Sequence, residues 1–441
     1  LHEQGYIEPA PSSLTSLGAF YIPHHAVINP HKATPRVVFD CAAIVNGQSL
    51  NDHISSGPDV ANSLLGILLR FREHPVALVA DVKAMFHQVV VPSLQRDALR
   101  LLWYTEDARE PTAFRFTRHP FGGTWSPAAC MTALDLTLRD YGGHLSPATQ
   151  QSLSRGFYVD DLLISTTDVK QAGILQQEAR QLLAKGGFNL TKWGSSHEDV
   201  LLDVPVEERG PAFKEIGQPT LDRALGVHWN PEADYFTFVT QPRVSPFTKR
   251  GILSQLSSLY DPMGIASPFI LRARLIFQQL CRQHSDWDDD LPSHLQPAWE
   301  TWLQELLQLV NIQLSRCVNS ARGEDHVFRL HHCCDASEAA YGVVSYLVTY
   351  GPANEIISST FLLGKARLAP LKKPTIPRLE LMAATLGATQ DEFLRRELTL
   401  PLQESMFWTD STITLAYITN ETKRLQTFVA NRVTKIRSQS E

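Results

Sequence analysis

The sequence predicts an α+β protein built from several domains, on the basis of its length and the patterning of its apolar residues. The chain has 441 residues, which is enough for about two to four domains with ample buried core. Apolar strands alternate with amphipathic helices over residues 20–240, whereas helical spacing dominates over 241–325. Strands return over 326–441, and residues 1–19 are expected to form an N-terminal extension.

Helix signals are clear in the first two regions. A helix is expected to begin near Pro58, because proline suits the first helical position. Apolar side chains then recur at helical spacing, at Leu64, Leu65, Leu68 and Phe71. In the second region, residues 261–264 (Asp-Pro-Met-Gly) are expected to form a turn between two helices.

Two adjacent carboxylates, Asp160 and Asp161, lie between short apolar β-forming segments, which predicts a hairpin with the acids at its tip. A tight hairpin turn favours Asn-Gly or Asp-Gly, whereas Asp-Asp places two like charges side by side without a glycine. A local rule broken without structural gain points to function. Hard divalent ions such as Mg²⁺ prefer carboxylate oxygens, so the pair is a candidate cation site; a solvated acidic turn is the alternative.

A third carboxylate, Asp81, lies near the end of the apolar run 76–82, which is typical of a buried strand. If this strand lies next to the hairpin, three carboxylates surround one position. Such a set can hold two metal ions about 3.5–4 Å apart, which clamp the attacking and leaving oxygens of an in-line phosphoryl displacement. The pattern therefore indicates metal-dependent phosphoryl transfer.

These segments, in this order, resemble a reverse transcriptase. Asp81 falls at the first metal-binding Asp of that family, and Tyr-Val-Asp-Asp at 158–161 matches its YxDD box. Other boxes resemble the fingers segment, the nucleotide-binding loop, a palm element and the primer-grip hairpin, at residues 36–40, 120–128, 186–193 and 225–229. The segments RVVFD, SLND, ADVKAMFHQ, YVDDLL, SSLYDPMGIASP and IPRLEL are similar to sequences of the BEL/Pao branch of LTR retrotransposons. This resemblance extends from about residue 20 to the end of the chain.

The resemblance implies a right-hand polymerase with fingers and palm (20–240) and a helical thumb or connection (241–325), followed by an RNase H-like α/β domain. It implies that Asp81 and Asp160 bridge two Mg²⁺ ions, with Mn²⁺ as the alternative metal, and that Asp161 assists. Further roles are implied for Arg36 and Lys32 at the nucleotide phosphates, Phe86 beneath the sugar, Phe121 and Gly122 in the nucleotide loop, and Lys192 as proton donor to pyrophosphate.

Three of these assignments have alternatives or departures. Phe86 has the properties of a plain core residue, and Lys192 those of a solvated surface lysine. Phe121 stands where many reverse transcriptases have Gln, which is expected to alter the nucleotide contacts.

A second acidic set lies in the third region. Asp335 follows a strand, Glu380 lies in the first turns of a helix, and Asp410 ends another strand. This order resembles RNase H, in which these acids hold two Mg²⁺ ions that activate water against an RNA phosphodiester. The family's fourth carboxylate is expected beyond Asp410 and has no suitable match before residue 441. The domain is therefore expected to be C-terminally truncated, which leaves its RNase H activity open.

Composition adds constraints of its own. The net charge of −6 is unusual for a nucleic-acid binder, but basic stretches at 241–284 and 361–378 can follow a phosphate backbone. Solvated helix faces are the alternative explanation. The sequence contains no apolar run of about 18 residues, so no membrane span is expected. The six cysteines show no zinc spacing and are interpreted as reduced intracellular thiols.

The sequence therefore predicts an RNA-directed DNA polymerase of a retrotransposon, a nucleotidyltransferase whose partners are an RNA template, a DNA primer, RNA–DNA hybrid and dNTPs. The expected location is intracellular, in cytoplasmic virus-like particles, with the nucleus as the alternative. The first rival is a catalytically inactive, decayed or host-adopted nucleic-acid-binding protein of the same fold. An aspartic peptidase is rejected, because the chain lacks Asp-Thr-Gly and Asp-Ser-Gly.

Starting at Leu1 without Met, the chain is expected to be a fragment of a longer polyprotein. The resemblance implies that a peptidase and an integrase for DNA integration lie in other segments of that polyprotein.

Overall fold

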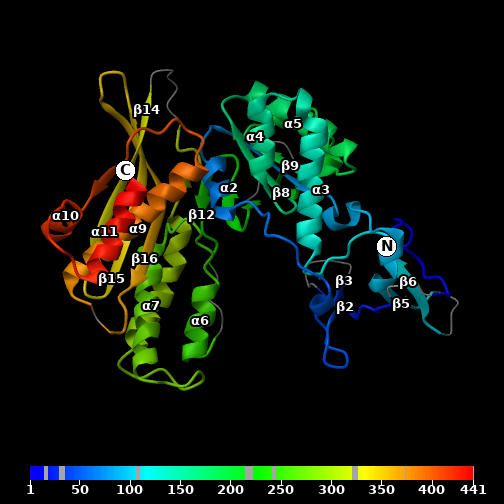
Figure 1. Cartoon of the computed structure of the whole chain (residues 1–441), viewed down its shortest axis with the longest axis horizontal. Coiled ribbons are helices and arrows are strands. Elements are labelled where there is room, and N and C mark those ends of the chain that lie inside the picture. The colour runs from blue at the N-terminus through cyan, green and yellow to red at the C-terminus, as the bar shows by residue number, and fades with distance from the viewer. Residues whose placement is uncertain are drawn as a thin grey trace.

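The computed structural model combines helices and strands in two lobes (Figure 1). One lobe contains the N-terminus and the helices α3, α4 and α5; the other contains α6, α7 and the C-terminal sheet, and α2 and β12 lie where the two lobes meet. None of the helices in the described residues is long and apolar enough to cross a membrane. The structure describes residues 1–13, 18–28, 35–105, 110–213, 222–240, 245–319, 326–372 and 374–440.

The palm is built on a four-stranded antiparallel sheet in the order β7-β8-β4-β9. Strand β4 is central because it pairs with both β8 and β9, and most of its apolar side chains are buried. The strands are β4 (Val76–Val82), β7 (Phe157–Tyr158), β8 (Asp161–Thr166) and β9 (Leu190–Ser195). The surrounding helices are α2 (Leu64–Phe71), α3 (Ser126–Tyr141), α4 (Pro147–Gly156) and α5 (Val169–Lys185).

Helix α2 begins later than predicted. Its first residue is Leu64, and the Gly66 amide donates a hydrogen bond to the Ser63 hydroxyl at 3.1 Å. The expectation of a start near Pro58 is wrong, because the N-terminal amides are capped by Ser63 and the preceding residues are not helical. The predicted apolar face is present, since Leu68 and Phe71 are fully buried.

The fingers contain a three-stranded sheet in the order β1-β6-β5 and a separate β2–β3 ladder. Residues 7–9, which fall in the segment expected to be an extension, form β1 and pair with β6, so they are part of this sheet. The elements are β1 (Ile7–Pro9), β2 (His24–Val27), β3 (Arg36–Phe39), α1 (Leu50–His53), β5 (Arg100–Trp103) and β6 (Thr112–Phe116).

The polypeptide after the palm forms a small antiparallel sheet and a helical unit. The sheet runs β10-β11-β12-β13, and its last strand returns from beyond the helices. The helices share a core in which Trp302 stacks on Trp299 and on Phe269. The elements are β10 (Asp222–Ala224), β11 (Val227–Asn230), β12 (Tyr235–Thr237), α6 (Lys249–Ser257), α7 (Ser267–Arg282), α8 (Gln296–Leu306) and β13 (Leu314–Ser315).

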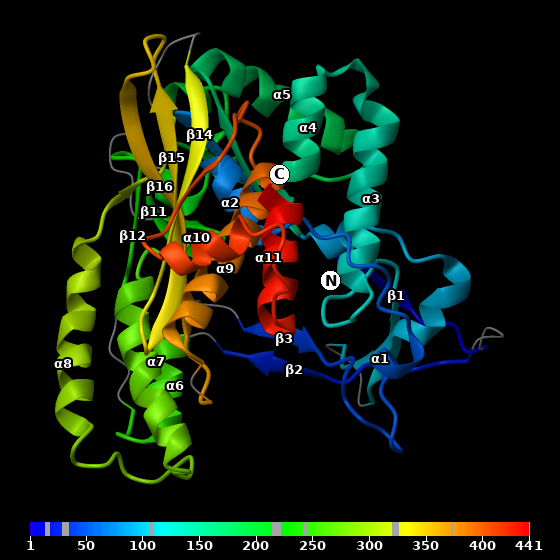
Figure 2. The ribbon, with the colours of Figure 1, turned by 60° about the vertical axis from the view of Figure 1, so that its left-hand side comes forward.

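The C-terminal domain is a four-stranded sheet in the order β16-β15-β14-β17, with β14 and β17 parallel. Helix α9 packs on β14 and β15, and α11 packs on α9 (Figure 2). The elements are β14 (Val327–Ala336), β15 (Ala340–Tyr350), β16 (Ile356–Leu368), α9 (Ile376–Glu397), β17 (Met406–Trp408), α10 (Thr412–Ile418) and α11 (Thr427–Ser440).

Short 3-10 helices connect the larger elements. They are η1 (Met85–Gln88), η2 (Ser93–Leu99), η3 (Gly142–His144), η4 (Glu198–Leu201), η5 (Val206–Glu208), η6 (Pro211–Phe213) and η7 (Leu307–Asn311).

The two lobes meet in a close-packed junction. The predicted turn at 261–264 inserts Met263, which is fully buried, into the palm core, and the Gly364 amide of β16 donates to the Met263 carbonyl at 2.9 Å. Nearby, Arg70 of α2 forms an ion pair of 2.6 Å with Glu397 at the end of α9. The junction therefore joins palm, thumb turn and C-terminal sheet into one packed unit.

We expect Gly264→Ala to weaken this junction. Gly264 has a φ of +72°, and a Cβ atom there would lie 1.9 Å from the Gly364 carbonyl oxygen. The clash and the left-handed backbone together should lower the free energy of unfolding by about 1–3 kcal/mol or more, measured by chemical denaturation. The matched control is Gly173→Ala in α5, where a Cβ meets nothing within 4 Å. A helical alanine there should be neutral or stabilising by about 1 kcal/mol; an equal loss in both variants would contradict the prediction.

Candidate active sites

The pairing of β4 with β8 brings the palm carboxylates together. Asp81 lies opposite Asp161 in the antiparallel register, and Asp160 occupies the two-residue turn between β7 and β8. The Asp160 carbonyl accepts a hydrogen bond of 2.8 Å from the Val82 amide, which fixes the turn against β4. The predicted hairpin with acids at its tip is therefore present, next to the strand that carries Asp81.

The turn between β7 and β8 holds a strained residue. Val159 has a φ of 54°, a region that is strongly disfavoured for a β-branched side chain. A positive φ confined to the first loop residue is typical of a type II′ hairpin turn, where glycine is preferred. Valine at this position in place of glycine costs about 1–3 kcal/mol in backbone strain. Strain of this kind is found at functional sites, which supports a functional role for the acids that the turn presents.

A bulge in β9 directs Lys192 at the same acids. The β4–β9 register shifts between Val79 and Asp81, and Lys192 has a φ of 54°. Bulges re-aim side chains, and here the Lys192 ammonium lies 2.6 Å from an Asp81 carboxylate oxygen. Burial raises the pKa of Asp81, the Lys192 ammonium opposes that shift, and the charge of Asp160 adds to it. Asp81 and Asp160 are thus close enough to interact electrostatically.

The residues expected at the nucleotide are divided between the fingers core, where Phe121 packs, and the palm core, where Phe86 packs. The Arg36 guanidinium lies over the Phe121 ring, 5.2 Å from its centroid. Gly122 has a φ of +97°, and a Cβ there would lie 2.3 Å from the Phe39 carbonyl oxygen, so only glycine fits this close approach. Phe86 lies in η1 and is half-buried against the palm core. Lys32 lies outside the described residues.

The acids of the C-terminal domain also gather at one end of their sheet. The parallel register places Cys333 of β14 beside Trp408 of β17, so Asp335, near the end of β14, and Asp410, two residues after β17, lie at the same end of the sheet. Both are exposed and line one pocket. The Ser411 hydroxyl donates to the Glu380 carboxylate. This contact brings Glu380 of α9, the third acid of the set, to the same end of the sheet.

Both sets offer the ligand chemistry that Mg²⁺ prefers, namely carboxylate oxygens from separate elements that meet at one place. Within the described ranges, no group of three or more His, Cys, Asp or Glu side chains is already arranged to hold an ion. In the palm, one Asp81 oxygen is paired instead with the Lys192 ammonium. The donor type therefore fits the metal, and a bound cation would compete with Lys192.

One Ser–His–Asp arrangement lies outside both acidic sets. The imidazole of His332 contacts the Ser345 hydroxyl at 2.6 Å and an Asp391 carboxylate oxygen at 2.9 Å. All three residues are buried, His332 and Ser345 completely. They join β14, β15 and α9 inside the C-terminal core, where no substrate can reach them, so this arrangement is structural.

A polymerase-like palm with its acids on neighbouring strands, flanked by fingers and thumb helices and followed by an RNase H-like sheet, defines a right-hand polymerase fold. The family model for the Pao retrotransposon-like RNaseH-like domain matches residues 248–411. The expected resemblance to a BEL/Pao-type pol fragment is confirmed by this match. No curated protein sequence matches the chain.

Solved structures of foamy viral protease-reverse transcriptase share the fold. The dRH form in complex with double-stranded DNA superposes with a TM-score of 0.62 at 16% identity, covering 99% of this chain and 65% of that one. The complex with an RNA/DNA hybrid gives 0.59 at 16% identity, covering 98% and 50%, and another complex with double-stranded DNA gives 0.61 at 15%, covering 100% and 79%. The predicted fold class is confirmed. This chain spans 65% of the length of the first of these proteins and 50% of the second.

Two histidines near Phe121, His87 and His119, have shifted pKa values that the sequence did not indicate. Burial lowers the pKa of both His87 and His119 below the ordinary value of 6.5. His87 is buried, and its Nδ1 atom lies 3.1 Å from the His119 carbonyl oxygen. The Trp125 indole donates to His119 Nδ1 at 3.2 Å. Protonation of His119 at Nδ1 would break the hydrogen bond from Trp125.

We expect the free energy of unfolding to fall as the pH is lowered from about 7.5 to 5.5. The unfolded chain takes up protons near pH 6.5, before the folded chain does, so stability present above this value is lost on acidification. His119→Asn removes one of these rings and should make the loss smaller in urea titrations. His144→Asn, at an exposed position, is the control; a parental pH profile in His119→Asn would contradict the assignment.

Proposed function

We propose that this chain is an RNA-directed DNA polymerase of a BEL/Pao-type retrotransposon. The observation that carries the proposal is the β4–β8 register, which sets Asp81 opposite Asp161 of β8 and beside the strained turn that bears Asp160. A packed strand end and a tight turn hold carboxylates more rigidly than a loop would, as a site for in-line displacement requires. The BEL/Pao match and the polymerase fold support the same assignment.

In the proposed mechanism Asp81 and Asp160 would hold two Mg²⁺ ions, with Mn²⁺ as a substitute, and Asp161 would assist. When bound, the ions lower the pKa of the primer 3′-hydroxyl and neutralise the triphosphate. Arg36 contacts the β- and γ-phosphates through its planar fork of donors, and its place over Phe121 fixes that fork. Lys192 donates a proton to the leaving pyrophosphate, since its ammonium already reaches the acids.

The proposed partners follow from this chemistry. The polymerase uses an RNA template, a DNA primer and dNTPs, and it grips the nucleic acid through backbone and shape while base pairing supplies the sequence. Asp335, Glu380 and Asp410 form an RNase H-like centre for the RNA–DNA hybrid. A peptidase and an integrase are proposed as further segments of the polyprotein, which acts in cytoplasmic virus-like particles.

A second candidate function is nucleic-acid binding without catalysis. It is favoured by the Lys192–Asp81 ion pair, which occupies an oxygen that a metal ion would need. Both candidates require the same fold and bind primer–template, so binding does not separate them. Incorporation of nucleotides does.

We expect the chain to extend a DNA primer on an RNA template with dNTPs and Mg²⁺, and Asp160→Asn to lower the rate at least about 100-fold. The substitution removes a carboxylate that would hold metal while the turn keeps its shape. Asp135→Asn, on the exposed face of α3, is the matched control and should keep the parental rate. If neither the parent nor Asp135→Asn extends a primer that both bind, the catalytic proposal fails and the binding function stands.

We also expect Phe86 to select the sugar. A half-buried ring in η1 beneath the nucleotide would clash with a 2′-hydroxyl, so Phe86→Val should raise incorporation of rNTPs relative to dNTPs by about tenfold or more. The measurement is the ratio of kcat/KM for a matched rNTP and dNTP pair. An unchanged ratio in a variant that still uses dNTPs would assign Phe86 to the core alone.

A further inference from the structure

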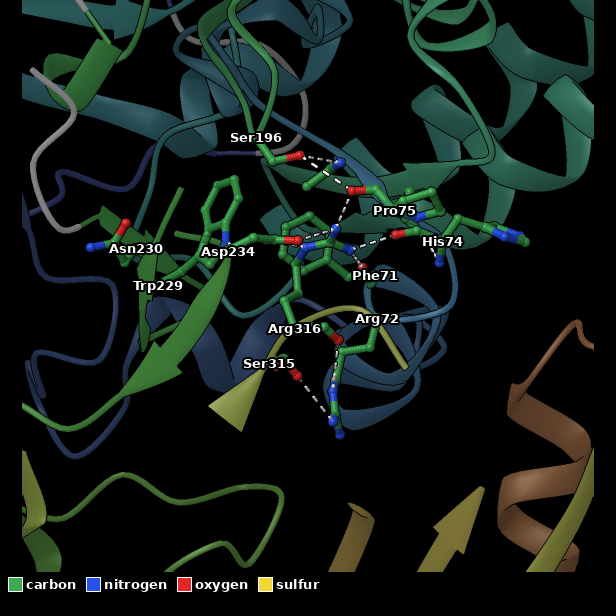
Figure 3. Close-up of polar contacts among 12 residues, drawn as sticks. Phe71, Arg72, His74, Pro75, Ser196, Trp229, Asn230, Asp234, Ser315 and Arg316 are labelled. Atoms are coloured by element: carbon green, nitrogen blue, oxygen red, sulfur yellow. Dashed lines mark hydrogen bonds and ion pairs between the residues drawn. The ribbon is translucent and has the colours of Figure 1, made fainter. Parts of the chain in front are cut away.

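A fully buried guanidinium, that of Arg316, connects the palm to the hairpin formed by β11 and β12 (Figure 3). Its Nε and Nη2 atoms donate to the two carboxylate oxygens of Asp234 at 2.6 and 2.7 Å. The other donors reach three palm carbonyls. These are the carbonyls of Pro75 at 2.7 Å, of His74 at 2.8 Å and of Phe71. Each of the five N–H groups of the guanidinium thus has an acceptor.

The two ends of this bridge are rigid parts of the molecule. Asp234 lies in the turn between β11 and β12 with a φ of 50°, and its carboxylate also accepts from the Trp229 indole at 3.0 Å. The Arg316 amide donates to the Asp234 carbonyl at 2.9 Å, so backbone and side chain grip the same residue. On the palm side, Pro75 immediately precedes β4, the strand that carries Asp81.

The hairpin tied down in this way belongs to the sheet whose first turn faces the thumb. The turn at Leu225 and Gly226 joins β10 to β11, and both residues have positive φ values, of 48° and 85°. A Cβ on Gly226 would lie 3.0 Å from the Tyr260 ring, so this turn is packed against the segment that follows α6. Trp229 and Phe236 of the same sheet are fully buried in the palm core, so movement of the turn at Asp234 relative to β4 would shift these strands against the palm.

The electrostatics make this anchor sensitive to a single charge. A second buried guanidinium, that of Arg72, lies beside Arg316 and donates to carbonyls of Arg316, Phe361 and Leu362. Its pKa is lowered to about 9 by burial and by the charge of Arg316. Asp234 is the carboxylate that pairs with Arg316, whereas Arg72 donates to backbone carbonyls and to the Met263 thioether.

We propose that Arg316 and Asp234 are positioning residues that hold the strands β10, β11 and β12 (residues 222–237) at a fixed place relative to β4 and so set where the primer 3′ end lies relative to Asp81. This inference rests on the proposed polymerase function. It requires the planar five-donor fork of arginine, because the three donors of a lysine ammonium cannot span a carboxylate and three carbonyls. The residues act through the hairpin and do not touch the reacting atoms.

The test compares Asp234→Asn with Arg70→Lys. Arg70 is a matched control because it forms a similarly buried pair with Glu397 that joins palm to α9 and not to the hairpin. We measure the melting temperature, the dissociation constant for primer–template, the rate of the first nucleotide addition, and the fluorescence of 2-aminopurine at the primer 3′ end. Both variants should melt at lower temperature than the parent.

The proposal expects Asp234→Asn to add the first nucleotide about tenfold or more slowly, with a changed 2-aminopurine signal and a dissociation constant within about threefold of the parent. Arg70→Lys should add it at the parental rate. A parental rate and signal in folded Asp234→Asn, or an equal loss in Arg70→Lys, would overturn the proposal. If Asp234→Asn does not fold, Trp229→Phe removes one hydrogen bond to Asp234 and should show the same pattern at about threefold.

Failure of the proposed function gives a different result. If the parent adds no nucleotide, polymerase activity is disproved, and the 2-aminopurine signal together with hydrogen exchange at residues 222–237 decides the positioning claim. Faster exchange there in Asp234→Asn than in Arg70→Lys, with an altered primer-end signal, supports the anchor. Equal exchange in the two variants refutes it.

Discussion

The arrangement of the palm depends on one constraint, the register in which β4 pairs with β8 and β9. Side chains alternate along a strand, so a slip by one residue would turn Asp81 away from Asp160 and bury the wrong face of the strand. The register is held by apolar side chains that pack on both sides of β4 and by the hydrogen bond from Val82 to the Asp160 carbonyl. Fold stability and the placing of the acids are therefore the same property of one strand.

The second organising element is the junction in which Arg72 and Arg316 are buried. Removing a charge from water is unfavourable, and a buried ion pair often contributes little net stability compared with apolar packing. What these arginines supply is geometry, because their forks bond to carbonyls of several segments at once, from α2, β13 and β16. A loss of register between the lobes would leave buried donors without acceptors, so the lobes are held in one relative position.

The sequence was sufficient where the chemistry is local and insufficient where it depends on long-range pairing. The run predicted as a strand at 76–82 is β4, and the acidic hairpin is present, because strand periodicity and turn composition act over a few residues. The start of α2 was misplaced because Pro58 and Ser63 are both acceptable helix signals, and the cap is formed by Ser63. Asp234 and Arg316, which are 82 positions apart, show no pattern that distinguishes them from surface residues. The bulge that aims Lys192 at Asp81 is likewise a product of strand pairing.

The ion pair between Lys192 and Asp81 explains how the acids can coexist in the half-buried palm. Burial and the neighbouring charge of Asp160 both favour protonation of Asp81, which would remove the negative charge that a metal ligand needs. The Lys192 ammonium opposes both effects, and its side chain remains largely exposed, so it can leave the carboxylate without a large desolvation penalty. The bulge in β9 and the strained turn at Val159 are thus two parts of one arrangement. The turn presents the acids to each other, and the bulge supplies the cation that opposes protonation of Asp81.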